Sequence, residues 1–200
     1  QEHNVRQGFF EREQFEAVRR HLPEHLRPLV TLAYITGWRL KSEIQSLQWR
    51  QIDFKAGTVR LEPGTTKNSE GRTFYMTPEL RAALEEQRAR TETLQRRRRR
   101  VIPWVFHRNG KPIKSIRIAW AKACKKAGVP GRIPHDLRRT AVRNMERAGV
   151  PRSVAMKMVG HKTESIYRRY AIVDEIMLRE GAERLARAEQ ARFAGTVGRE

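Results

Sequence analysis

Apolar residues recur with helical spacing along most of this chain of 200 residues, and they alternate only in one short stretch. The alternation begins after Trp49 and ends near Met76. A period of about 3.6 residues is typical of an amphipathic helix and a period of about two is typical of a strand, so one segment cannot satisfy both. The chain is therefore predicted to be mainly helical, with one small sheet.

Three short segments carry the alternation, and turn residues separate them. Residues 51–54 and 58–61 flank Lys55-Ala56-Gly57, a combination typical of a tight hairpin. A polar stretch at residues 65–71 then leads into a third segment at residues 72–76. We therefore expect a three-stranded antiparallel sheet inside a helical protein, which is an α+β fold.

Helical segments account for most of the remaining chain. Thr77 before Pro78 predicts a helix start, because threonine caps a helix and proline suits its first turn. Gly37 predicts a helix end, because glycine tolerates the left-handed backbone found there. Five consecutive arginines at residues 96–100 are expected to form a solvated loop or helix face. Helices are expected at residues 11–21, 26–36, 41–47, 77–94, 115–127, 135–148, 151–159, 163–169 and 174–190.

The charge balance indicates a polyanionic partner. The chain has 42 Lys and Arg residues against 22 Asp and Glu residues, which gives a formal net charge of +20. Such a charge attracts nucleic acid by releasing condensed counterions. Ribosomal and chromatin proteins share this property, so the charge alone does not select a function.

The sequence carries no signal for a membrane or an oxidising compartment. No apolar run approaches the roughly 20 residues of a membrane span, and no signal-peptide pattern opens the chain. The single cysteine, Cys124, lies at helical spacing from apolar neighbours and is expected in the core. These features fit a protein of the reducing cytoplasm.

A histidine and an arginine lie one helical turn apart in the last third of the chain. His135 and Arg138 are at positions i and i+3, so both point from one face of the predicted helix. Pro134 predicts that the helix begins here, and the unpaired N–H groups of a helix start favour an anion. The pair is therefore a candidate phosphate site, with an ordinary charged helix face as the structural alternative.

Further residues that could bind a phosphate or transfer a proton are spread along the chain. Arg39 follows a glycine turn, and His161 ends a predicted helix after Gly160. Lys67 lies at the tip of a predicted hairpin, where Arg72 is the alternative basic residue. Each of these residues alone is ordinarily a surface, capping or dipole-neutralising group.

Two tyrosines complete a set of groups suited to cutting a phosphodiester. Tyr167 and Tyr170 are one helical turn apart, and the hydroxyl of either could attack phosphorus, so chemistry alone does not choose between them. Arginines hold non-bridging phosphate oxygens in bidentate fashion, and a lysine or histidine can protonate the departing oxygen. No metal site is expected at His135 and His161, because neither histidine lies in a His-x-x-x-His pattern and the chain has no cysteine pair.

Taken in order, these segments resemble the phage-integrase family of tyrosine site-specific recombinases. The resemblance covers the chain from about residue 9 to residue 185. The matching stretches are Thr36-Gly37-Trp38-Arg39, the Lys67 hairpin, His135-Asp136-Leu137-Arg138-Arg139-Thr140, Gly160-His161-Lys162-Thr163 and Arg169-Tyr170. The resemblance implies the catalytic-domain fold of that family at residues 11–173, after a remnant of an interdomain linker at residues 1–10. A C-terminal helical tail at residues 174–200 would either fold back on its own domain or be exchanged between protomers.

The resemblance also implies a role for each candidate residue. The two arginines would bind the scissile phosphate, the lysine would be the general acid, and the two histidines would complete the pocket. The nucleophile would be Tyr170, because Tyr167 falls off the family's spacing. The family has an acidic residue three positions after its first arginine, where Ser42 stands here, so Glu43 would take that role from the next position. The implied catalytic residues are Arg39, Glu43, Lys67, His135, Arg138, His161 and Tyr170.

The implied activity is site-specific cleavage and rejoining of DNA through a 3′-phosphotyrosine intermediate, without a cofactor or a metal. The implied partners are double-stranded DNA and further copies of the chain, which would form a tetramer on paired DNA sites and be weakly associated or monomeric when free. No membrane partner is expected. One alternative is an enzyme like a type IB topoisomerase that relaxes supercoils. Another is a non-catalytic DNA-binding protein of the same fold.

Overall fold

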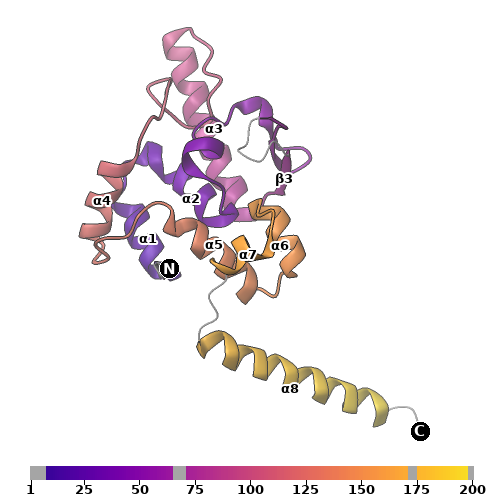
Figure 1. The fold of residues 1–200 in the computed structure, drawn as a ribbon. Coiled ribbons are helices and arrows are strands. Elements are labelled where there is room, and N and C mark those ends of the chain that lie inside the picture. Colours follow the sequence, from indigo (N-terminus) through magenta and orange to yellow (C-terminus); the bar gives the residue numbers. More distant parts are fainter. Residues whose placement is uncertain (1–7, 65–70, 171–174, 198–200) are drawn as a thin grey trace.

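The computed structural model of the chain describes residues 8–64, 71–170 and 175–197, and most of them are helical (Figure 1). Three short helical turns, η1 (Glu24–Leu26), η2 (Leu40–Ile44) and η3 (Trp49–Gln51), join the longer elements. The α-helices are α1 (Arg12–His21), α2 (Arg27–Thr36), α3 (Pro78–Arg98), α4 (Arg117–Lys126), α5 (Asp136–Arg147), α6 (Arg152–Val159), α7 (Glu164–Arg168) and α8 (Glu175–Val197). The prediction of a mainly helical fold is confirmed.

The small sheet has the predicted three antiparallel strands. β2 (Thr58–Leu61) lies between β1 (Ile52–Asp53) and β3 (Arg72–Tyr75), and its central residue Val59 is opposite Phe74. Val59 and Phe74 are both buried, so this face of the sheet joins the core.

The sequence Arg108-Asn109-Gly110-Lys111-Pro112 predicts a turn, and the structure forms a second hairpin around it. β4 (His107–Arg108) and β5 (Lys111–Pro112) pair around Asn109 and Gly110, both of which have positive φ. A two-residue turn with positive φ at both positions matches the twist of the flanking strands. Two-residue strands are too short to show an alternating pattern, which is why the sequence revealed the turn and not the pairing.

Helix α2 lies at the centre of the fold, where it packs against α5, α3 and α1 (Figure 1). Nearly all of its side chains are buried, including the polar Thr31 and Thr36. A helix that is apolar on all sides is stable only when other elements surround it. The end of α2 therefore delivers the chain that follows it into the interior, directly beside α5.

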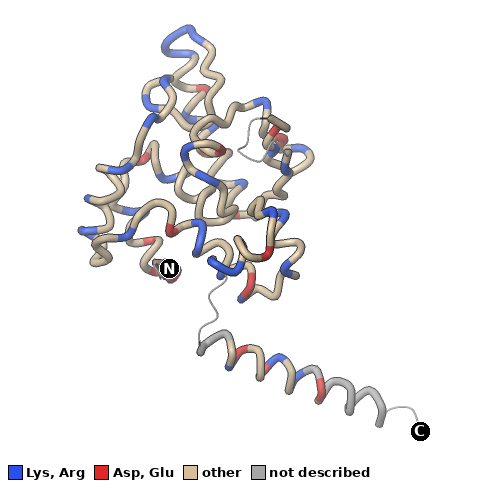
Figure 2. Tube along the Cα trace, in the orientation of Figure 1, with Lys and Arg blue, Asp and Glu red and all other residues tan. Residues whose placement is uncertain are grey.

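Helix α3 continues about one turn beyond its predicted end and contains the first three residues of the arginine run. It ends at Arg99, whose positive φ forms the C-cap. Cations in the last turn of a helix interact favourably with its dipole. Figure 2 shows these arginines at the tip of the molecule, and all five are exposed.

The segment that enters α1 is bound along α5. The backbone N–H of Phe10 donates to Thr140 Oγ1 at 2.9 Å, and Arg143 Nη2 donates to the Phe10 carbonyl at 3.0 Å. The carboxylate of Glu11 pairs with Arg143 at 2.9 Å and with Arg147 at 3.1 Å. These bonds hold the start of the described chain against the helix that begins at His135.

Helix α8 extends away from the packed body in Figure 1. Its leucines Leu178 and Leu185 are 66% and 63% exposed, so the described part of α8 does not fold back into the core of its own domain. Arg184 nevertheless donates to the carbonyl of Arg147. Among the described residues, no helix combines the length and apolar character that crossing a membrane requires.

Replacing Arg143 should destabilise the fold. Arg143→Met removes a buried donor from the Phe10 carbonyl and a partner from Glu11, so the free energy of unfolding should fall by about 1–3 kcal/mol. Arg147→Met is the matched control, because Arg147 pairs with the same carboxylate but is more exposed, and it should cost less. Urea denaturation of the full chain measures both; equal losses would contradict the importance of the bond to Phe10.

Candidate active site

The candidate pocket is a cluster of side chains where the ends of α2 and α6 meet the start of α5, and a glycine turn places Arg39 at its edge. Gly37 ends α2 with φ +66°, and a Cβ there would lie 2.6 Å from Val159 Cγ1. Trp38 then enters the core, where its indole N–H donates to the carbonyl of Met158 at 2.9 Å. Because this turn is locked on both sides, the next side chain, Arg39, has a defined direction.

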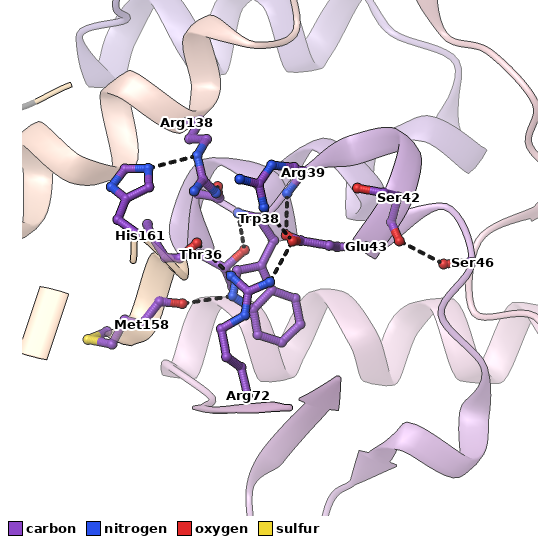
Figure 3. A network of polar contacts seen from close by, with 12 residues as sticks. Thr36, Trp38, Arg39, Ser42, Glu43, Ser46, Arg72, Arg138, Met158 and His161 are labelled. Carbon is purple, nitrogen blue, oxygen red and sulfur yellow. Dashed lines mark hydrogen bonds and ion pairs between the residues drawn. The ribbon is translucent and has the colours of Figure 1, made fainter. Parts of the chain in front are cut away.

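The carboxylate of Glu43 holds Arg39 by two bonds. Oε2 accepts the backbone N–H of Arg39 at 2.7 Å, and Oε1 accepts its Nη1 at 2.9 Å. The turn η2 is π-helical, since the N–H groups of Ile44 and Gln45 each donate to a carbonyl five residues earlier. A π turn contains one residue more than an α turn. The longer turn therefore brings Glu43, and not Ser42, to Arg39, as Figure 3 shows.

The start of α5 presents His135 and Arg138 to the same pocket. His135 is the N-cap residue, and Arg138 lies one turn later and is 2% exposed. Arg138 Nη1 donates to the Gly37 carbonyl at 2.5 Å, and Arg138 Nε donates to His161 Nε2 at 3.1 Å. One guanidinium therefore joins the turn after α2 to the turn after α6.

His161 follows a second glycine turn. Gly160 ends α6 with φ +74°, and His161 is then buried at 6% exposure. Because its Nε2 accepts from Arg138, the proton of the neutral ring is on Nδ1. His161 also stacks on the ring of Tyr170, with ring centroids 4.8 Å apart.

The two candidate tyrosines lie in different environments. Tyr167 is fully buried, and this burial raises the pKa of its hydroxyl. Tyr170 is only partly buried, and its hydroxyl is 3.1 Å from His135 Nε2. The guanidinium carbon of Arg138 lies 5.7 Å from the centre of the Tyr170 ring. Tyr170 is thus at the pocket in its own subunit, and Tyr167 supports the wall behind it.

The pocket is strongly cationic, and the pKa values of both histidines are lowered in it. Burial, followed by the charges of Arg138 and Arg39, lowers the pKa of His161 to about 3. Partial burial of the ring and then the charges of Arg138 and Arg139 lower the pKa of His135, although part of His135 remains open to solvent. Both rings are therefore neutral at pH 7. Burial and the charge of Arg39 lower the pKa of Arg138 to about 10, which leaves its guanidinium charged.

Two buried donors of the pocket have no partner within the described chain. They are Nη2 of Arg138 and Nδ1 of His161. A buried donor without a partner costs free energy, so such groups are uncommon unless a ligand completes them. A guanidinium and an imidazole N–H are both suited to the oxygens of a phosphate.

Six of the seven predicted catalytic residues converge here: Arg39, Glu43, His135, Arg138, His161 and Tyr170. The seventh, Lys67, lies outside the described residues. Arg72 was considered only as an alternative to Lys67, and it donates instead to Glu43 and to the Val159 carbonyl. Its position in a strand gave no signal of this contact, because the partners are far away in sequence.

Among residues 8–64, 71–170 and 175–197, no group of three or more His, Cys, Asp or Glu side chains could hold a metal ion. Cys124 is buried, and burial raises the pKa of its thiol to about 11. The groups of the pocket are guanidinium cations, neutral imidazoles, a phenol and the buried carboxylate of Glu43.

Comparison of the sequence with known proteins identifies relatives over most of the chain. A family model described as the phage integrase family matches residues 9–176. The integrase of Salmonella phage P22 is 30% identical over 176 residues, a match that covers 81% of this chain and 43% of the P22 protein. The chain thus spans less than half the length of this relative.

Solved structures share the fold. The crystal structure of XerA recombinase has a TM-score of 0.74 at 17% identity, covering 88% of this chain and 65% of XerA. The Tn1549 transposon integrase in complex with transposon right end DNA has a TM-score of 0.69 at 18% identity. The match covers 89% of this chain and 66% of the transposon integrase chain. The catalytic domain of bacteriophage HP1 integrase has a TM-score of 0.58 at 20% identity. The match covers 82% of this chain and 86% of the HP1 domain.

Acidification should destabilise the folded chain through His161. Its pKa is about 3 in the folded state and about 6.5 when unfolded, so below pH 6.5 the unfolded state binds the proton and gains stability. The free energy of unfolding should fall by about 1–2 kcal/mol between pH 6.5 and pH 5, as urea denaturation at each pH measures.

A matched pair of variants tests whether His161 causes this pH dependence of the free energy of unfolding. His161→Asn should flatten the slope, whereas His21→Asn, at an exposed position, should leave it intact. His135, His25 and His107 also have lowered pKa values and contribute in the same direction, so part of the slope remains. An unchanged slope in His161→Asn would show that the ring does not remain neutral when the chain is folded.

Proposed function

Because the chain belongs to the phage integrase family, whose model spans residues 9–176, we propose that it is the catalytic part of a site-specific DNA recombinase. The proposed reaction cleaves and rejoins DNA strands through a 3′-phosphotyrosine intermediate. The observation that carries this proposal is the position of the Tyr170 hydroxyl, 3.1 Å from a neutral imidazole and beside a buried guanidinium with an unpartnered N–H. The other candidate hydroxyl, on Tyr167, is buried away from solvent.

In the first step, Tyr170 attacks the phosphorus of the scissile phosphodiester. A free tyrosine has a pKa of about 10, so its hydroxyl is a poor nucleophile at pH 7 unless a base accepts its proton. His135 is neutral at pH 7 and its Nε2 is in hydrogen-bond contact with the hydroxyl. We assign His135 as the group that accepts this proton while the bond between the phenolic oxygen and phosphorus forms.

The cations stabilise the charge that develops on the phosphate. Negative charge grows on the non-bridging oxygens as the phosphorus becomes five-coordinate. Nη2 of Arg138 and Nδ1 of His161 are available to donate to these oxygens, and Arg39 adds a second guanidinium that Glu43 holds in place. The bonds of Arg138 to the Gly37 carbonyl and of Arg39 to Glu43 orient both guanidinium groups before the substrate arrives.

The bond to the 5′ oxygen then breaks, and this oxygen takes a proton to leave as a hydroxyl. The family resemblance assigns this proton to the ammonium group of Lys67. In the reverse direction a 5′-hydroxyl attacks the phosphotyrosine, the tyrosine leaves, and the phosphodiester forms again. The covalent intermediate conserves the bond energy, so rejoining requires neither a nucleotide nor a metal.

The proposed partners are duplex DNA and three further copies of the chain on paired sites, with weak or no association away from DNA. The net charge of +20 supports a duplex partner. Among structural relatives, a lambda integrase dimer is bound to a COC′ core site and XerH is bound to difH substrate. The proposed location is the cytoplasm, in association with the nucleoid.

The nucleophile can be identified by trapping the covalent adduct. A nicked duplex pool with randomised sequence loses a short fragment after cleavage, so the adduct accumulates and denaturing electrophoresis detects it. Tyr170→Phe should abolish the adduct, because the attacking oxygen is absent. Tyr167→Phe removes a hydroxyl of the same helical region and should retain the adduct. An adduct formed by Tyr170→Phe would refute the assignment.

The C-terminal tail should control assembly. Leu178 and Leu185 are exposed on α8, and we propose that they pack against a second copy on DNA, with residues 174–200 acting as an exchanged tail after a catalytic domain at residues 11–173. Leu178→Ser with Leu185→Ser should remove cooperativity from binding to paired sites, as gel-shift titration measures, while binding to a single site is retained. Unchanged cooperativity would contradict the proposal.

A further inference from the structure

Arg72 of β3 bridges the two glycine turns of the pocket. Its Nη2 donates to Glu43 Oε1 at 2.5 Å, and its Nη1 donates to the carbonyl of Val159 at 2.6 Å. The Arg72 side chain is only 8% exposed, and the Glu43 side chain is fully buried. Figure 3 shows the Arg72 side chain rising to the ring of Trp38, with its guanidinium directed toward Glu43.

The surroundings of Arg72 are shaped to this side chain. Its guanidinium carbon lies 5.8 Å from the centre of the Trp38 ring, within the range of a cation–π contact. On the other side, a Cβ at Gly160 would overlap the guanidinium. Only glycine therefore fits at position 160, both because its φ is +74° and because Arg72 occupies the space.

Both acceptors of Arg72 lie next to residues of the proposed reaction. Glu43 Oε1 also accepts Nη1 of Arg39, so the same oxygen joins two guanidinium groups. The Val159 carbonyl comes directly before the turn that carries His161, and His161 accepts from Arg138. A displacement of Arg72 would therefore change the placement of Arg39 on one side and of His161 on the other.

We propose that Arg72 is a positioning residue, which fixes the distance between Arg39 and the pair His161–Arg138 around the scissile phosphate. This role rests on the proposed recombinase function. Arg72 does not act as a proton donor in it, because both arms of its guanidinium are committed to buried acceptors. A planar fork can reach two acceptors at once, whereas the ammonium of lysine is a single point charge.

The test compares Arg72→Lys with wild type in the full chain. The duplex is one recovered from the randomised nicked pool as an efficient substrate of wild type. Three quantities are measured: the single-turnover rate of adduct formation, the affinity for uncleaved DNA, and the thermal midpoint of unfolding. Rates are taken well below the midpoint of each variant, so that only folded protein is compared. Arg60→Lys, an exposed change on the neighbouring strand β2, is the matched control.

We expect Arg72→Lys to lower the rate of adduct formation by about 100-fold, the size expected when reacting groups are displaced by about 1 Å. DNA affinity should remain within about twofold, because the guanidinium is buried and both of its arms are bound to acceptors of the protein. Glu43→Gln should lower the rate similarly, and the double variant should be no slower than the worse single variant, because both residues act through Arg39. Arg60→Lys should behave as wild type.

Three results would overturn the positioning role. A rate for Arg72→Lys within threefold of wild type would show that charge alone suffices. Multiplicative losses in the double variant would show that Arg72 and Glu43 act separately. A loss of DNA affinity equal to the loss of rate would make Arg72 a DNA contact. If wild type itself forms no adduct, the proposed function fails and the positioning role fails with it.

Discussion

The carboxylate of Glu43 lies buried between two guanidinium groups, and the geometry of the pocket depends on it. Arg39 comes from the turn after α2 and Arg72 comes from β3, and their positive charges would repel each other without the carboxylate between them. Removing one member of a buried ionic group leaves the others unpaired, which costs far more than the net gain of forming the group. The contact therefore specifies where two separate elements meet, and Arg39 is held in place as a consequence.

The same interior position explains the protonation states of the pocket. Arg39, Arg72 and Arg138 together lower the pKa of His161, and burial contributes most. A neutral His161 accepts a hydrogen bond from Arg138 through Nε2 and keeps a proton on Nδ1 for a ligand. The site is thus prepared for an anion, because an incoming phosphate offsets the mutual repulsion of the cations.

The spacing of apolar residues and glycines along the sequence was sufficient to predict much of the fold. The period of the apolar residues located the helices and the three strands, and the glycines at 37 and 160 marked two helix ends because each has a left-handed backbone. The spacing of His135 and Arg138 also predicted that both would face one pocket. These features depend on neighbours within one turn, which a sequence displays directly.

Other features required contacts between distant segments. The choice of Tyr170 over Tyr167 rested on a family spacing. The structure adds two physical differences, the burial of Tyr167 and the contact of the Tyr170 hydroxyl with His135. Glu43 was predicted for the acidic role from a position one residue later than the family has it, and only the π turn explains how it reaches Arg39. Lys67 lies outside the described residues, so its predicted role stays a prediction.

The sequence by itself determined which chemical groups are present, which elements carry them and which helix face they occupy, because those properties follow from local backbone preference. Only the tertiary structure decided that Arg72 joins Glu43 to the end of α6, since its partners are 29 and 87 residues away along the chain. Burial and charge at such a junction depend on every element that surrounds it, and no local pattern encodes that sum.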